Sequence, residues 1–176
     1  MSARELREAS GLGRGDAEGT RDGSQPSAGG ATRHLTLPHL PYGDAVNAEL
    51  IASGLGPDRV HAGVRRELGG PCELYLTALW TPDHADLDGS VWPEGLTVSW
   101  SHLTGWSAHD GDTVRQLGGD GDVDDLAPPA LIADAVLHLA VHGLDIAWTP
   151  PAGGRWEHAD DLDAALDAFT ERGTDW

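Results

Sequence analysis

Three residues that can bind a metal ion recur at four-residue intervals within an apolar segment of the chain. They are Asp134, His138 and His142. Residues four apart lie on one face of an α-helix, so these side chains form a single stripe. Two imidazoles one turn apart can hold a divalent metal ion, and a carboxylate one turn earlier can supply a third ligand. The pattern predicts a candidate metal site. The alternative is that these residues are only the polar stripe of an otherwise apolar helix.

Other patterns that carry chemistry are incomplete. The acidic run Asp120–Asp125 starts like a calcium-binding loop, but Asp125 stands where the turn needs glycine and Leu131 where a glutamate ligand belongs. The sequence has no His-Glu-x-x-His or Gly-x-Ser-x-Gly motif, and Cys72, its only cysteine, has no base near it in sequence. We therefore expect a protein without catalytic activity and without a cofactor, unless a divalent metal binds at the helical stripe.

Tryptophan is unusually frequent, with seven residues against one phenylalanine and two tyrosines. Trp80, Trp100 and Trp106 fall on or near apolar strand faces and are predicted to lie in the core. Trp92, Trp156 and Trp176 fall in loops or at the end of the chain, where an exposed indole often marks a contact surface. These three residues are the candidate partner-binding site, and packing at the edge of the core is the alternative.

The chain is strongly acidic, with a formal net charge of -18. Residues 1–33 hold five arginines and five acids, so the whole excess lies on the remaining residues. Such a surface repels phosphate backbones and anionic lipid headgroups, which argues against direct binding to nucleic acids or membranes. It suits a partner protein with a basic surface or a divalent cation, and it also keeps a small protein in solution.

The composition divides the chain into a tail and one domain. Residues 10–33 are rich in Gly, Ser, Ala, Thr and charge and cannot bury enough apolar surface to offset chain entropy, so we expect residues 1–34 to be disordered. The rest, residues 35–176, is long enough for a single domain. Neither a secretory signal nor an apolar run of about 18 residues occurs, and we therefore expect a cytoplasmic protein.

Periodicity within residues 35–176 predicts an α+β fold. Asp44 is a predicted cap for a helix that ends near Ser53, with Val46, Leu50 and Ile51 on its apolar face. Alternating residues then predict an antiparallel meander of about four strands with helices packed on one face. The expected strands are 60–65, 73–80, 96–101 and 106–108, followed by a helix from Pro129 to Gly143, a short edge strand at 144–148 and a helix at 160–172. Residues 81–95 are expected to form an exposed loop.

Several short motifs appear in a characteristic order: Tyr75-Leu76-Thr77-Ala78-Leu79, Pro82-Asp83, Trp100, Gly105-Trp106 and Pro128-Pro129. Across residues 42–142, this order resembles an uncharacterised actinobacterial family of small proteins known as a domain of unknown function. The loop before Trp92 is longer here, Ser101-His102 replaces a usual acidic pair, and a helix is added at the C-terminal end. The resemblance implies the α+β fold and a bacterial source, and it implies no activity.

Three functions fit the sequence. The first is a non-catalytic adaptor or regulatory module that binds another protein through an acidic surface with exposed tryptophans. The second is a metal-dependent enzyme or sensor built on Asp134, His138 and His142. The third is an acidic mimic of nucleic acid that inhibits a DNA-binding protein. The sequence predicts neither the partner's identity nor the oligomeric state.

Overall fold

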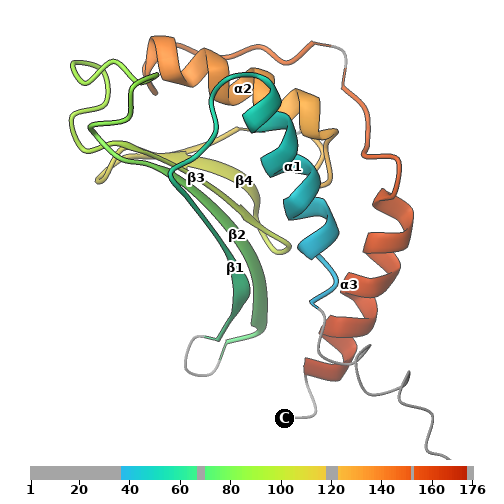
Figure 1. Cartoon of the computed structure of the whole chain (residues 1–176). Coiled ribbons are helices and arrows are strands. Elements are labelled where there is room, and N and C mark those ends of the chain that lie inside the picture. The colour runs from blue at the N-terminus through green and yellow to red at the C-terminus, as the bar shows by residue number, and fades with distance from the viewer. Residues whose placement is uncertain (1–36, 67–69, 118–122, 152, 174–176) are drawn as a thin grey trace, which may run out of the picture. The chain divides into compact units, whose positions relative to one another are not determined.

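The computed structural model describes residues 37–66, 70–117, 123–151 and 153–173, and within these ranges the chain forms a curved antiparallel sheet with helices on one side (Figure 1). The predicted tail, residues 1–34, lies outside the described residues. None of the described helices is long and apolar enough to cross a membrane. The elements in chain order are α1 (Leu40–Ala52), β1 (Arg59–Arg66), β2 (Cys72–Trp80), β3 (Leu96–Ser101), β4 (Gly105–His109), β5 (Val114–Gln116), α2 (Pro129–His142) and α3 (Ala159–Gly173).

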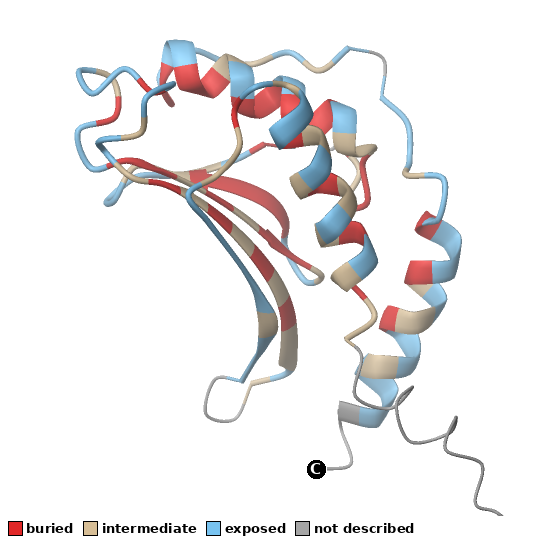
Figure 2. Cartoon of the chain, in the orientation of Figure 1, coloured by how far each residue is buried: buried red, intermediate tan, exposed pale blue. Residues whose placement is uncertain are grey.

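The sheet is a meander in which the strands follow the order β1-β2-β3-β4-β5 and every neighbouring pair is antiparallel. This confirms the predicted fold, with β5 as a strand beyond the expected four. In β2 and β3 the alternate residues that face the helices are buried, and those between them are partly exposed except for the buried Ser101 (Figure 2). The tryptophans predicted for the core, Trp80, Trp100 and Trp106, are all buried.

The first helix starts earlier than the sequence suggests. The prediction that Asp44 caps it is wrong, because α1 begins at Leu40 and Pro41 fits its first turn, where no backbone N–H is needed. Tyr42, Val46 and Leu50 form its buried face, whereas Ile51 is 59% exposed. Gly43 allows close contact with the sheet, since a Cβ there would lie 2.6 Å from Cδ2 of Leu76 on β2.

The segment after α2 does not form the predicted edge strand. Leu144 and Ile146 instead offer their carbonyl oxygens to the guanidinium of Arg115 on β5. Because the arginine side chain takes acceptors that a strand ladder would use, this segment runs beside the β5 edge without pairing to it. The last helix matches its prediction closely, with Leu162 and Leu166 buried.

Tyr42 joins three parts of the core. Its hydroxyl donates a hydrogen bond of 2.8 Å to the carbonyl oxygen of Ala127 and accepts one of 3.1 Å from Nε1 of Trp106. Burial raises the pKa of Tyr42, so the phenol keeps the proton that it donates. The hydroxyl thus links α1, β4 and the segment before α2.

Replacing Tyr42 with Phe should lower the free energy of unfolding by about 2 kcal/mol, because the change leaves a buried N–H and a buried carbonyl without their partner. Urea unfolding followed by tryptophan fluorescence measures this difference. Tyr75→Phe, at a half-buried position on the other side of the sheet, is the matched control and should cost less than about 0.5 kcal/mol. Equal losses in the two variants would contradict the role assigned to the Tyr42 hydroxyl.

Candidate functional site

The tryptophans predicted to contact a partner lie in different surroundings. Trp92 is completely buried, and its Nε1 donates a hydrogen bond of 3.0 Å to the carbonyl oxygen of Leu139 on α2. The prediction of an exposed indole there is wrong, because an indole whose N–H finds an acceptor in the core is well placed away from water. The β2–β3 loop, predicted to be exposed, is consequently anchored on α2 by Trp92, and Leu87 in the same loop is also buried.

Trp156 is half-buried at the edge of the core. Its ring centroid lies 5.0 Å from that of Tyr42 and 5.0 Å from that of His158. Its backbone N–H donates a hydrogen bond of 2.7 Å to the carbonyl oxygen of Leu126, which fixes the approach to α3. Trp176 lies outside the described residues. The predicted patch of exposed indoles therefore reduces, in the described part of the chain, to one partly exposed ring.

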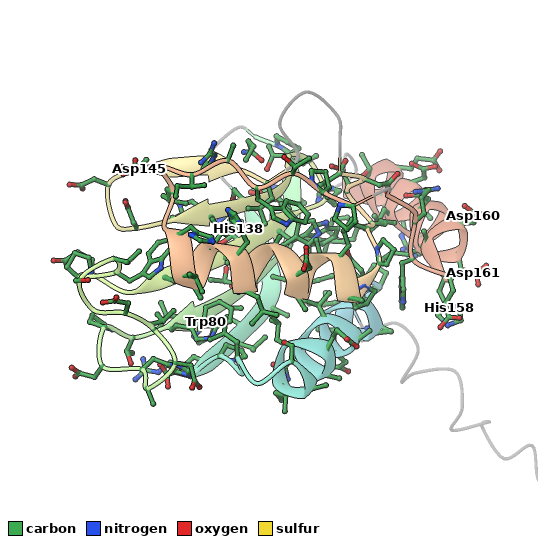
Figure 3. All side chains as sticks on the ribbon, turned by 90° about the horizontal axis from the view of Figure 1, so that it is seen from above. Trp80, His138, Asp145, His158, Asp160 and Asp161 are labelled. Carbon is green, nitrogen blue, oxygen red and sulfur yellow. The ribbon has the colours of Figure 1, made fainter. Side chains whose placement is uncertain are left out.

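The predicted metal ligands do not come together as a group. His138, labelled on α2 in Figure 3, and His142 have ring centroids 4.5 Å apart. Oδ2 of Asp134, however, accepts a hydrogen bond of 3.0 Å from the indole of Trp148. Nε2 of His138 is buried without a hydrogen-bond partner. Among the described residues, no set of three or more His, Cys, Asp or Glu side chains could hold a metal ion. Two histidines fall short of the three protein ligands that even an open zinc site uses.

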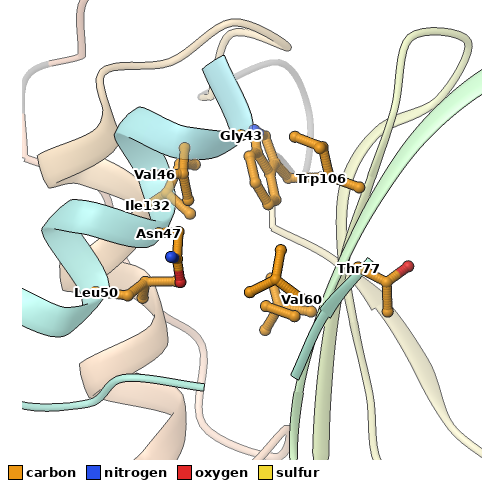
Figure 4. A pocket seen from close by; sticks show the side chains of 11 residues that line it. Gly43, Val46, Asn47, Leu50, Val60, Thr77, Trp106 and Ile132 are labelled. Carbon is orange, nitrogen blue, oxygen red and sulfur yellow. The ribbon is translucent and has the colours of Figure 1, made fainter. Parts of the chain in front are cut away.

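A narrow apolar pocket lies between α1 and the sheet. Figure 4 shows Val46 and Leu50 of α1 facing Val60 of β1 across it. Its volume of about 20 Å³ is the space of a single water molecule, and an apolar lining offers a water too few hydrogen-bond partners. The pocket is a packing gap and not a ligand site.

The first strand is exposed along its length. Seven of the eight residues of β1 are exposed and only Gly63 is intermediate. On the helix side, Val60 and Val64 are 42% and 43% exposed, and they pair with the buried Ala78 and Leu74 of β2. On the other face lie Arg59, His61 and Arg65, because side chains alternate along a strand. This edge presents both apolar surface and positive charge.

A polar hollow of about 220 Å³ lies on the face of the sheet away from the helices. Thr77, Ser99 and Ser107 stand side by side in register on β2, β3 and β4 and are among its lining residues. The Ser107 hydroxyl lies 3.1 Å from Nε2 of His109, and the hydroxyls of Thr77 and Ser99 are 3.4 Å apart. The alternation that predicts the core face of these strands also predicts that these hydroxyls lie opposite it.

His39 is a buried ionisable residue that sequence reasoning missed. It precedes α1, is fully buried, and stacks on Trp100 with ring centroids 5.8 Å apart. Its Nε2 lies 3.0 Å from the carbonyl oxygen of Tyr75, whereas its Nδ1 has no partner. Burial lowers the pKa of His39; the hydrogen bond to Tyr75 partly opposes this shift, and nearby His102 adds to it. A neutral ring that donates through Nε2 satisfies these surroundings.

Comparisons with known proteins assign no family to the chain. No protein-family model matches it, and searches of curated proteins and of solved structures found no match. The resemblance to an actinobacterial family therefore stays a prediction, and the function rests on the residues described above.

The buried His39 should make the fold less stable in mild acid. A histidine whose pKa is lower in the folded state than in the unfolded state, where it is about 6.5, stabilises the fold above that pH and loses this contribution as the pH falls. We expect the free energy of unfolding to drop between about pH 7.5 and about pH 5.5, and His39→Gln to reduce the drop. Urea unfolding at both pH values measures it. His61→Gln, on exposed β1, is the control; an unchanged pH dependence in His39→Gln would show that another group is responsible.

Proposed function

We propose that this chain is a non-catalytic protein-binding module that accepts an extended segment of a partner along the edge of β1. The observation that carries the proposal is a strand of eight residues at the edge of the sheet whose outer side pairs with no described strand. An exposed edge strand presents unpaired backbone N–H and C=O groups, which an added strand can satisfy.

The opposite edge of the sheet is protected. β5 has only three residues, and the side chain of Arg115 holds the segment Leu144–Ile146 beside it. Short edge strands and covering segments are the usual means by which proteins prevent strand addition. The contrast between the two edges supports a binding role for β1 in particular.

The side chains of β1 select the chemistry of the added segment. Its helix-side face offers Val60 and Val64, and its other face offers Arg59 and His61, beside Arg65, whose guanidinium is paired with Glu73. The complement is a segment that alternates apolar and acidic residues. A second copy of β1 fits poorly, because an antiparallel pairing centred on Ala62 sets Arg59 of one copy opposite Arg65 of the other, and like charges directly opposite destabilise a pair.

The charge of β1 is unusual in this protein. Arg59, Arg65 and Arg66 are half of the arginines among the described residues; the others are Arg115, Arg155 and Arg172. The remaining surface is acidic. Binding of a basic partner protein to that surface, as the sequence predicts, is a second form of the same proposal. It has less support, because Trp156 is the one predicted contact tryptophan that is partly exposed among the described residues. A cytoplasmic location is part of the proposal.

The two other functions predicted from the sequence have less support. A metal-dependent enzyme or sensor needs Asp134 as a ligand, and this carboxylate is engaged by Trp148. A mimic of nucleic acid would use the acidic remainder of the surface, which gives the basic strand β1 no role. Neither function accounts for the exposure of β1.

The proposal predicts binding of a labelled peptide as long as β1, eight residues, in which valine and glutamate alternate. Fluorescence anisotropy should detect saturable binding at low salt, and Val64→Glu should weaken it at least about tenfold by placing a charge against the apolar side chains of the peptide. Backbone amide signals of β1 should shift in NMR spectra and gain protection from hydrogen exchange.

Two controls make the test specific. Val141→Glu changes a valine that is 65% exposed on α2 and should leave binding unchanged. A peptide that alternates valine and lysine, and one with the valines and glutamates in two blocks, should bind at least about tenfold more weakly. Equal binding of all three peptides, or amide shifts confined to elements other than β1, would overturn the proposal.

A further inference from the structure

The polar hollow on the open face of the sheet is not explained by strand addition at β1. The residues Thr77, Ser99, Ser107 and Gln116 face one another in register across β2, β3, β4 and β5. All four line the hollow of about 220 Å³. Four neighbouring strands therefore contribute hydroxyl or amide groups to one concave surface, whereas a sheet face that only meets water needs no such continuity.

The hydroxyls of the hollow can both donate and accept hydrogen bonds. Each serine or threonine hydroxyl has one donor and two acceptor positions. The two contacts within the hollow, 3.1 Å from Ser107 to His109 and 3.4 Å from Thr77 to Ser99, leave most of this capacity open. Ser107 is only 9% exposed, so its hydroxyl is held in place at the floor. A ligand that itself carries several hydroxyls matches such a lining.

Charge excludes ionic ligands. Among the described residues, those that line the hollow include no aspartate or glutamate, so they offer a cationic ligand no counter-ion. Their one arginine, Arg65, makes a bidentate ion pair with Glu73 on the neighbouring strand, and this pairing lowers the pKa of Glu73. The net charge of -18 disfavours the approach of an anion. These charges favour a neutral ligand over a cation or an anion.

One wall of the hollow is an aromatic ring held in a fixed position. The guanidinium carbon of Arg65 lies 5.4 Å from the centroid of the Tyr75 ring. On β1, a Cβ at Gly63 would lie 3.1 Å from the Tyr75 hydroxyl, so the ring extends over Gly63 and uses the space that a side chain would fill. An aromatic wall beside a floor of hydroxyls provides apolar contact and hydrogen bonds together.

We infer that the hollow between Tyr75 and Ser107 binds a small, neutral, polyhydroxylated molecule such as a monosaccharide or a cyclitol. The hydroxyls of Thr77, Ser99 and Ser107 exchange hydrogen bonds with the hydroxyls of the ligand, and the ring of Tyr75 contacts its C–H surface. No bond is made or broken. The inference is independent of the proposed function, because β1 contributes only Arg65 to the lining of the hollow.

The test is an NMR titration of the full chain with D-glucose, D-galactose and myo-inositol as separate probes, each up to about 50 mM. At least one probe should shift the amide signals of Thr77, Ser99 and Ser107 saturably. Ser107→Ala and, separately, Thr77→Val should weaken that binding about fivefold to tenfold, because each removes one hydrogen-bonding group. Thr170→Ala, which changes an exposed threonine on α3, should have no effect.

Charged analogues complete the test. Glucuronate and glucosamine should bind more weakly than the neutral sugar, glucuronate because of the net negative charge and glucosamine because the described part of the lining has no acid. Absence of saturable shifts with all three neutral probes would overturn the inference, as would tighter binding of either charged analogue. Saturable binding that is unchanged in both Ser107→Ala and Thr77→Val would overturn it as well, because the hydroxyl floor would then play no part.

Discussion

Each buried indole N–H must find an acceptor, and this requirement fixes how the separate parts of the domain are joined. An N–H left unpaired in the core costs about 1–3 kcal/mol, so a buried tryptophan specifies the position of whatever carries its acceptor. Trp80, Trp92, Trp100 and Trp106 each meet this need with a different segment. Their acceptors are, in order, the carbonyl oxygens of Leu55, Leu139 and Asp125 and the hydroxyl of Tyr42. These hydrogen bonds join the loops that contain Leu55, Trp92 and Asp125 to the sheet or to α2.

The same constraint makes the two faces of the sheet different. Because the buried indoles gather on the side of the helices, the loops and connecting segments gather there too, and the other face keeps its hydroxyls and charges. Gly43 brings α1 close to Leu76 of β2, and β1 lies at the margin of this cover, where Val60 alone of its residues lines the narrow pocket beneath α1. The exposed edge of β1 and the polar hollow are therefore two consequences of one-sided covering.

Local patterns were enough to predict most of the fold. Alternation in residues 74–80 and 96–100 is a property of neighbouring residues, and it correctly assigned Trp80 and Trp100 to the core. The predictions are wrong where a group far away in the sequence determines the local structure. Trp92 is buried because Leu139 offers an acceptor 47 positions along the chain, and residues 144–148 are held by Arg115 instead of by a strand. An apolar pair such as Val91-Trp92 within a loop was the available sign of burial, since large apolar side chains seldom stay fully exposed.

The candidate site was harder to predict than the fold. Helical spacing correctly brought His138 and His142 together, but it could not show that Trp148 would engage Asp134. Val60 and Val64 follow the pattern of a half-buried strand, and they stay exposed because β1 lies at the edge of the sheet, which is a property of the whole fold. The alignment of Thr77, Ser99, Ser107 and Gln116 depends on the register of four strands, and the sequence of a single strand does not determine that register.

The two proposed binding surfaces meet at Arg65. This residue lies on β1, beside the proposed strand-addition edge, and its guanidinium also holds Tyr75 at the wall of the hollow. Substituting Arg65 would therefore disturb both surfaces and distinguish nothing. Substitutions at Val64 and at Ser107 distinguish the two surfaces. Val64 lies on the helix side of the sheet, paired with Leu74, whereas Ser107 lies on the opposite face, paired with Ser99. If the protein binds the peptide through Val64 but binds no sugar, its binding site is the edge of β1 alone. If it binds a sugar through Ser107 but not the peptide, its function lies on the open face of the sheet.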